Sequence, residues 1–298
     1  MHSDYDVFDC HCDSLTSTNI RRNNGHLKMR DIEKYRRYIQ VFAICPENYS
    51  AYSFTKHYIS VFHKMTRLCS MTEIRGKRDL SFSRGAILAL EGADALCGNI
   101  ASLKYFYNEG VRLITITWNN NNAAASSITA LNDSGLTDFG KRLVKKCGEM
   151  GIAVDLSHIG DKGFYDVAEI IEKPFICSHS NSRSVNGKFK RNITDDQFSV
   201  IMKHGGAVGI NFCVDFLGLE GDLSAVLRHI EHFSSLGGKK NIGIGSDFDG
   251  IPCLPRGCNG AEFISEIAEA LLQLNYQECD VRDILYGNFK RVFKNILF

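Results

Sequence analysis

Five residues with metal-binding side chains stand at the ends of short apolar runs: His11, Asp13, Glu91, His158 and His179. Neutral imidazole and carboxylate groups are ligands for divalent cations such as Zn²⁺. One catalytic zinc ion usually keeps three protein ligands and an open position, so five ligands suit two cations about 3.5–4 Å apart. We expect Glu91, which comes from an intermediate run, to bridge them. Water between two cations loses a proton near neutral pH, which would provide a hydroxide nucleophile.

A further pair of acidic residues follows the last apolar run, in a segment flanked by Gly245 and Gly250. Asp247 is the candidate proton carrier, which would take a proton from the attacking water and deliver it to a leaving amine. Asp249 has the same parity along a strand and is the alternative for this role.

Regular elements must position these residues, and short apolar runs alternate with helically spaced ones along the chain. The runs predict strands at 5–11, 38–45, 85–91, 112–118, 152–157, 174–179, 207–213 and 242–247. Helices are predicted at 54–71, 100–108, 138–150, 164–171, 195–203, 223–233 and 261–274. Eight strands alternating with helices predict a closed α/β barrel, the (β/α)8 TIM barrel, with its active site at the carboxyl ends of the strands. An open doubly wound sheet is the alternative.

Side-chain alternation along the first predicted strand separates two kinds of candidate ligand. His11 and Asp13 point the same way in a strand, whereas Cys10 and Cys12 point the opposite way. We expect His11 and Asp13 to face the barrel axis and both cysteines to pack outward against helices. The alternative makes the cysteines the zinc ligands, but it would place unpaired charge in an apolar layer, which is unfavourable.

The composition excludes several classes of protein. The 298 residues include 35 basic and 34 acidic side chains, without the basic excess of a dedicated nucleic-acid binder. No apolar run approaches the roughly 20 residues of a membrane-spanning helix, and no secretory signal is expected. The eleven cysteines form no Cys-Xaa-Xaa-Cys pair, and their odd number favours reduced thiols and a cytoplasmic location. No linker divides the chain, so we predict one domain over residues 1–298.

Short motifs follow one another in a recognisable order from the first predicted strand to the end of the chain. They are His11-Cys12-Asp13, Leu90-Glu91-Gly92, Gly135-Leu136-Thr137-Asp138-Phe139-Gly140, Asp155-Leu156-Ser157-His158, Ser178-His179-Ser180, Arg191-Asn192, Gly245-Ser246-Asp247-Phe248-Asp249-Gly250 and Tyr286-Gly287-Asn288-Phe289-Lys290-Arg291-Val292-Phe293. Together they resemble the renal-type membrane dipeptidases and their bacterial relatives, which are binuclear zinc barrels of the amidohydrolase superfamily. Each motif is weak alone, but the ordered set is specific.

The resemblance implies a role for each matching ligand residue. It assigns one zinc ion to His11, Asp13 and Glu91, and the other to Glu91, His158 and His179. The fold it implies is a TIM barrel of the metal-dependent hydrolase type.

Two further residues match functional positions of the same family. Arg191 matches the arginine that binds the terminal carboxylate of the substrate, a role suited to a planar bidentate donor. Its alternative role is that of a solvated member of the basic run 188–191. Asp247 matches the proton-transferring aspartate, in agreement with its position after the last strand.

One position departs from the family pattern. Where the vertebrate enzymes have a histidine thought to steady the substrate carbonyl, this chain has Trp118, which donates a single hydrogen bond and carries no charge. Asn119 or Asn121 could supply part of the lost polarisation, so Trp118 and Asn121 join the predicted substrate-binding residues.

We therefore predict a soluble dipeptidase with two Zn²⁺ ions per chain, in which the bridging hydroxide attacks the peptide carbonyl and Asp247 protonates the departing amine. Its partner would be a dipeptide, with neither nucleic acid nor membrane bound, and a homodimer is the candidate assembly. The alternatives are a metal-dependent hydrolase of another small amide, such as an N-acyl amino acid or a lactam, and a catalytically silent metal-binding scaffold.

Overall fold

Parallel strands close into a barrel in the computed structural model, which describes residues 3–17, 25–46, 50–218 and 221–298. The strands of these residues are β1 (Ser3–Cys12), β2 (Tyr35–Ile44), β3 (Thr72–Glu73), β4 (Arg84–Glu91), β5 (Val111–Thr115), β6 (Ala153–Asp155), β7 (Ile176–Cys177), β8 (Ala207–Ile210) and β9 (Ile242–Ile244). Their order is β2-β1-β9-β8-β7-β6-β5-β4-β3, and β2 also pairs with β4, which closes the ring. The short β3 pairs with the start of β4. The predicted (β/α)8 TIM barrel is confirmed.

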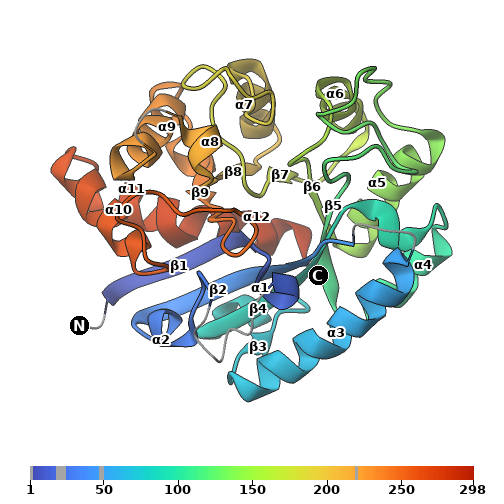
Figure 1. Cartoon of the computed structure of the whole chain (residues 1–298), viewed down its shortest axis with the longest axis horizontal. Coiled ribbons are helices and arrows are strands. Elements are labelled where there is room, and N and C mark those ends of the chain that lie inside the picture. The colour runs from blue at the N-terminus through green and yellow to red at the C-terminus, as the bar shows by residue number, and fades with distance from the viewer. Residues whose placement is uncertain (1–2, 18–24, 47–49, 219–220) are drawn as a thin grey trace.

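Helices lie outside the strands, as Figure 1 shows. Within the described residues they are α1 (Ser14–Ser17), α2 (Met29–Ile32), α3 (Ala51–Leu68), α4 (Ala101–Asn108), α5 (Asp138–Met150), α6 (Asp161–Ile170), α7 (Asp195–Lys203), α8 (Val214–Leu217), α9 (Leu223–Ser235), α10 (Phe263–Gln273), α11 (Glu278–Arg282) and α12 (Asn288–Ile296). The predicted helices correspond to α3, α4, α5, α6, α7, α9 and α10. None of the helices in this part of the chain combines the length and apolarity needed to span a bilayer.

Capping explains why two helices begin at the predicted residues. Thr137 precedes α5, and its side chain accepts a hydrogen bond from the backbone N–H of Gly140 at 3.0 Å. Thr194 and Gln197 form a reciprocal capping box at the start of α7. Each cap satisfies a backbone donor that has no partner within the helix.

The buried apolar side chains form two clusters. The inner cluster fills the barrel, and the outer cluster lies between the strands and the helices. Alternate residues of β2, Ile39 and Val41 among them, belong to the inner cluster. Phe42 belongs to the outer cluster, where it packs on Phe62 of α3 with 6.2 Å between ring centroids. The strands are therefore buried on both faces, as the apolar runs predicted.

Helix α12, which was not among the predicted helices, closes one end of the barrel. Its Phe289 and Phe293 pack on Phe8 of β1, with ring centroids 5.7 and 5.0 Å apart. Gly243 of β9 makes room for the helix, because a Cβ atom there would lie 2.3 Å from the Phe289 ring. Since Phe8 precedes the candidate ligands along β1, α12 covers the end opposite the site.

A bulge in β1 changes the side-chain alternation just before the candidate site. Asp9 pairs with Gln40 and Cys12 pairs with Phe42, so three steps along β1 match two along β2. Cys12 packs in the outer cluster as predicted, but Cys10 packs in the inner one. The predicted outward orientation of Cys10 is therefore wrong, because simple alternation does not hold across a bulge.

Candidate metal centre

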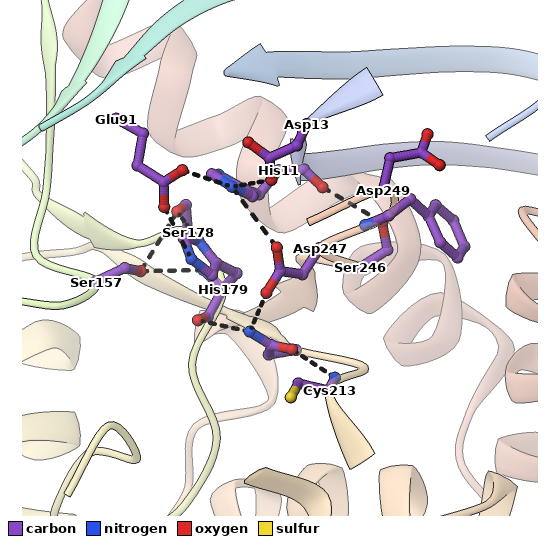
Figure 2. A network of polar contacts seen from close by, with 12 residues as sticks. His11, Asp13, Glu91, Ser157, Ser178, His179, Cys213, Ser246, Asp247 and Asp249 are labelled. Atoms are coloured by element: carbon purple, nitrogen blue, oxygen red, sulfur yellow. Dashed lines mark hydrogen bonds and ion pairs between the residues drawn. The ribbon is translucent and has the colours of Figure 1, made fainter. Parts of the chain in front are cut away.

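The five predicted ligands converge at the carboxyl ends of the strands, and Figure 2 shows four of them around a common centre. His11 Nε2 lies 3.4 Å from Asp13 Oδ2 and 3.6 Å from Glu91 Oε2. The other oxygen of Glu91, Oε1, lies 3.3 Å from His158 Nε2 and 3.5 Å from His179 Nε2. The two carboxylate oxygens of Glu91 thus face different ligand pairs.

These contacts define two ligand groups that share Glu91. Candidate ligand atoms of His11, Asp13 and Glu91 all lie within 4.8 Å of one another, and the same holds for Glu91, His158 and His179. We call the first pair with Glu91 the His11–Asp13 half and the second the His158–His179 half. All five side chains are buried. Two divalent cations could be held side by side, with one carboxylate between them.

The ring nitrogens test whether the residues fit a cation. Both nitrogens of His11 are buried and lack a hydrogen-bond partner, although an unsatisfied buried polar atom is normally costly. His158 Nε2 and His179 Nε2 face one another at 2.9 Å. A divalent cation would accept the lone pairs of the Nε2 atoms that meet here, so the residues fit a metal.

Electrostatics distinguish the histidines of the two halves. Burial, followed by the charge of Arg191, lowers the pKa of His158, and burial likewise holds the pKa of His179 well below its ordinary value. Both rings are therefore neutral, the form that binds metals. Burial opposes a charge on His11, but Glu91 and Asp13 together outweigh it and raise the pKa of His11 well above the usual range. The carboxylate-rich half attracts positive charge.

The long loop after β5 supports the His158–His179 half. Asn119 Oδ1 lies 2.9 Å from His158 Nδ1, so the amide oxygen accepts the ring N–H and leaves Nε2 free for a ligand. Ser127 Oγ donates to the Asn119 carbonyl at 3.0 Å, which holds the asparagine in place. The other candidate, Asn121, accepts from the Ser127 backbone N–H at 2.9 Å and shapes the loop instead.

Asp247 follows β9 and lies at the edge of the His11–Asp13 half. Its Oδ1 is 3.8 Å from His11 Nε2, and its Oδ2 accepts from Asn211 Nδ2 at 2.9 Å. Its backbone is left-handed, with φ of 61°, a conformation that costs about 1–2 kcal/mol for a non-glycine residue and is typical of functional sites. Gly250 permits this packing, because a Cβ there would lie 2.1 Å from Asp13 Oδ2 and 2.5 Å from Asp247 Oδ1.

Asp249 makes different contacts from Asp247. Its Oδ1 accepts from the His26 backbone N–H at 2.6 Å, and its Oδ2 accepts from the Ser14 hydroxyl. It therefore ties the segment before α2 to the loop after β9. These contacts suit a structural role, whereas Asp247 is the residue next to the ligands.

A cavity of about 520 Å³ opens over the candidate ligands. Trp118, Asn119 and Asp247 contribute to its lining, together with Asp13, Glu91 and His158. Its other lining residues include the apolar side chains of Phe54, Phe216, Ile251 and Pro252. A volume of this size suits a small molecule.

Arg191 is buried beside the histidine ligands but is not among the residues that line this cavity. Its Nη1 donates to Ser180 Oγ at 2.6 Å and its Nη2 donates to the His179 carbonyl at 2.8 Å. Its Nε is buried without a partner. The guanidinium is thus fixed next to the His158–His179 half and is not a solvated surface group.

Several residues that contact the ligands were given no role in the sequence analysis, although Asp155 and Ser178 stand in two of its motifs. Asp155, Ser178 and Thr115 form a hydrogen-bonded group behind His179, and Asn211 holds Asp247. Asp155 has the inward parity at the end of its strand that Glu91 has in β4, so strand parity was the signal that could have found it. The hydroxyl partners carry no such signal, because serine and threonine are common at strand ends for many reasons.

Ligand groups at the carboxyl-terminal mouth of a closed parallel barrel define the class of the barrel-type metal-dependent hydrolases. The family model of the membrane dipeptidases, peptidase family M19, matches residues 2–297, and the chain belongs to this family. The suspected family is thereby confirmed.

Relatives among known proteins include Dipeptidase 3 of Mus musculus, 33% identical over 218 residues that cover 70% of this chain and 44% of the relative. Dipeptidase 3 of Homo sapiens is 30% identical over 249 residues, which cover 80% of this chain and 51% of the relative. The chain thus spans about half the length of the curated relatives it matches.

Solved structures share the fold over nearly the whole chain. The metallopeptidase dipeptidase AC, of family M19, has a TM-score of 0.89 and 25% identity, with 99% of each chain covered. A metallopeptidase from Rhodobacter sphaeroides, bound to a phosphinate mimic of the dipeptide L-Ala-D-Ala, has a TM-score of 0.84 and 24% identity. That comparison covers 99% of this chain and 100% of the other.

Proposed function

We propose that this chain is a dipeptidase that uses two Zn²⁺ ions. The observation that carries the proposal is the pair of ligand groups that share Glu91 beneath a cavity of about 520 Å³. Membership of the membrane dipeptidase family supports it, as does the dipeptide mimic bound to the Rhodobacter sphaeroides metallopeptidase of the same fold.

The proposed ligands are those of the two halves, with Glu91 between the ions. Bound there, the cations would supply Lewis acidity to a substrate carbonyl and lower the pKa of a nearby water molecule. The neutral imidazoles of His158 and His179 offer lone pairs, while Asp13 and Glu91 offer negative charge. The buried position of all these groups excludes bulk water and strengthens electrostatic interactions at the reacting carbonyl.

Asp247 is the proposed proton carrier. Asn211 occupies its Oδ2, so Oδ1, which faces His11 at 3.8 Å, is the oxygen that would hold and deliver a proton to the leaving amine. Arg191 is proposed to bind the substrate carboxylate, which its match to the family position and its place next to the His158–His179 half support. Trp118 and Asn119 would contact the substrate from the cavity wall, and Asn121 would act through the loop.

The test is reconstitution. The protein would be stripped with a chelator, reloaded with Zn²⁺, Co²⁺ or Mn²⁺, and assayed with a panel of dipeptides and a matched panel of N-acyl amino acids and lactams. We expect zinc-dependent release of free amino acids from dipeptides. Preference for the N-acyl compounds would favour the second candidate activity, which the Trp118 side chain in the cavity wall suggests. Two bound metals without turnover of any compound would favour a metal-binding scaffold.

Two further parts of the proposal concern the setting of the protein. The odd number of cysteines, eleven, and the lack of a Cys-Xaa-Xaa-Cys pair in the sequence support a reducing, cytoplasmic environment. A homodimer is the proposed assembly, and sedimentation of the metal-loaded protein would test it.

A further inference from the structure

Asp155, at the end of β6, is a fully buried carboxylate behind the His158–His179 half. Its Oδ2 accepts from the hydroxyls of Thr115 and Ser178, each at 2.6 Å. Its Oδ1 accepts from the backbone N–H groups of Ser178 at 2.7 Å and Ser157 at 3.1 Å. Within the described chain it forms no ion pair with a lysine or arginine. A carboxylate that receives four donors is in its ionised, acceptor-only form.

Ser178 links this carboxylate to a candidate ligand. Its Oγ, which donates to Asp155, also lies 2.7 Å from His179 Nδ1. A serine hydroxyl has a single hydrogen, and the ionised Asp155 takes it, so the Ser178 oxygen accepts from His179. The proton of the His179 ring is therefore on Nδ1. The lone pair of Nε2 points to Glu91 Oε1 at 3.5 Å and to His158 Nε2.

We propose that Asp155 and Ser178 are positioning residues that fix the tautomer and basicity of His179 and thereby set the metal affinity of the His158–His179 half. The inference rests on the metal centre of the proposed function. A carboxylate that hydrogen-bonds a metal-bound histidine makes the ring a better donor, and loss of such a partner weakens metal binding. In this chain a serine hydroxyl carries the interaction across one additional hydrogen bond.

We call the hydrogen-bonded series Asp155–Ser178–His179 the relay. The other histidines of the site lack such support, so the relay is specific to the His158–His179 half. His158 Nδ1 is held by the neutral amide of Asn119. His11 has no hydrogen-bond partner on either nitrogen. Among the described residues that contact these three rings, Ser178 is the one that connects a ring to a buried anion.

The chain provides its own control for testing the relay. Thr115 and Ser178 donate to the same oxygen of Asp155 at the same distance, and both are fully buried. Ser178 also accepts from His179, whereas no hydrogen bond between Thr115 and a ligand is present in the described structure. Thr115→Val and Ser178→Ala each remove one hydroxyl donor from Asp155, but Ser178→Ala also leaves His179 Nδ1 without its acceptor.

The experiment is a zinc titration of the apo full-length chain against a chromophoric chelator, for the wild type and both variants. Ser178→Ala should weaken one of two zinc sites by about 10- to 100-fold. Thr115→Val should leave both affinities unchanged within error. Thermal unfolding of the apo variants should show a larger loss of stability for Ser178→Ala, which loses the contact with His179 as well as the bond to Asp155, so both titrations are run at a temperature where each variant is folded. Equal zinc affinity in the two variants would overturn the inference.

A second measurement does not depend on the folding of a variant. Long-range ¹H–¹⁵N spectra of the apo wild type should show His179 with its proton on Nδ1, and a proton on Nε2 would overturn the inference. A wild type that binds no zinc would defeat both the proposed function and the relay. A wild type that binds two zinc ions without peptidase activity would defeat only the function, and the variant titrations would still decide the relay.

Discussion

The two halves of the candidate metal centre differ in how their side chains would stabilise a bound cation. In the His11–Asp13 half, negative charge comes directly from ligand side chains, and neither ring nitrogen of His11 has a hydrogen-bond partner. In the His158–His179 half, both other ligands are neutral imidazoles, and each ring is held at Nδ1 by a side chain behind it. The first half would therefore attract a cation through the charges of its own ligands. In the second half, hydrogen bonds orient the imidazole rings, and the nearest additional anion, Asp155, reaches His179 through Ser178.

Both halves contain an aspartate that accepts hydrogen bonds from the backbone N–H and the hydroxyl of one serine, an arrangement that we call the Asp–Ser clamp. Asp9 accepts from the backbone N–H of Ser246 at 2.9 Å and from its hydroxyl at 2.5 Å, as Asp155 does with Ser178. Burial raises the pKa of Asp9 to about 6. Ser246 precedes Asp247, and its hydroxyl accepts from the Phe248 backbone N–H at 3.3 Å. The Asp–Ser clamp of Asp9 and Ser246 thus fixes only the backbone around Asp247, whereas that of Asp155 and Ser178 also orients the imidazole of His179.

The largest effect is expected in the carboxylate-rich half. Asp247→Asn should lower kcat by about 10²- to 10⁴-fold, because the amide cannot carry the transferred proton. Both metals should remain, since all five proposed ligands are intact. Turnover of a dipeptide and the metal content of the purified variant would be measured together.

The control for this variant is Asp249→Asn, which changes the alternative proton carrier. Its carboxylate is occupied by backbone and hydroxyl donors, so a much smaller loss of kcat is expected. Loss of one metal ion from Asp247→Asn would contradict the division of roles, because it would make Asp247 a ligand together with His11 and His179.

The alternation of side chains along strands decided which residues of the metal centre could be predicted from the sequence. Glu91, His158 and His179 were found because they end apolar runs, and parallel strands bring such ends to one mouth. Parity failed at Cys10, because a bulge leaves no mark in the composition of a strand. Networks such as that of Asp155 join residues from separate strands, so their partners depend on three-dimensional register that no spacing rule contains.

Helix α12 marks another limit of sequence reasoning. Phe289, Val292, Phe293 and Ile296 are buried at helical spacing, so the helix itself could have been predicted. Its place across the closed end of the barrel could not, because that depends on the room that Gly243 leaves inside β9.

Acid should weaken the imidazole-rich side of the mouth. His229 is buried, its Nδ1 accepts from the Ser182 backbone N–H at 3.1 Å, and its Nε2 donates to the Leu217 carbonyl at 3.2 Å. These bonds require a neutral ring, and burial lowers the pKa of His229 from 6.5 to about 4. Ser182 begins the segment that carries Arg191, so the histidine braces that side of the site.

The sign of the pH effect follows from proton binding. Below pH 6.5 the unfolded chain binds a proton at His229 that the folded chain does not, so the free energy of unfolding falls as the pH drops from 6.5 toward 4. The loss should approach about 3 kcal/mol near pH 4 and be absent above pH 6.5. Urea unfolding of the apo protein across this range would measure it. His229→Gln should show a shallower dependence, and identical slopes for the two proteins would disprove the assignment.

The smallest expected effect is a change in the fluorescence of Trp118, which we expect to report on the His158–His179 half. Trp118 is the single tryptophan of the chain, lines the cavity, and adjoins Asn119, which holds His158. Zinc or substrate bound nearby should change its fluorescence, because a charge or an apolar group beside the indole alters its surroundings.

Zinc titrations followed by this fluorescence would connect the signal to the His158–His179 half. In Ser178→Ala the midpoint of the emission change should move to higher zinc concentration, whereas Thr115→Val should keep the wild-type midpoint. Trp118→Phe provides the blank, because it removes the signal without touching a ligand. If the midpoint moves equally in both variants, the loss of a hydroxyl donor to Asp155 is what lowers the zinc affinity, and the inferred role of the contact between Ser178 and His179 is wrong.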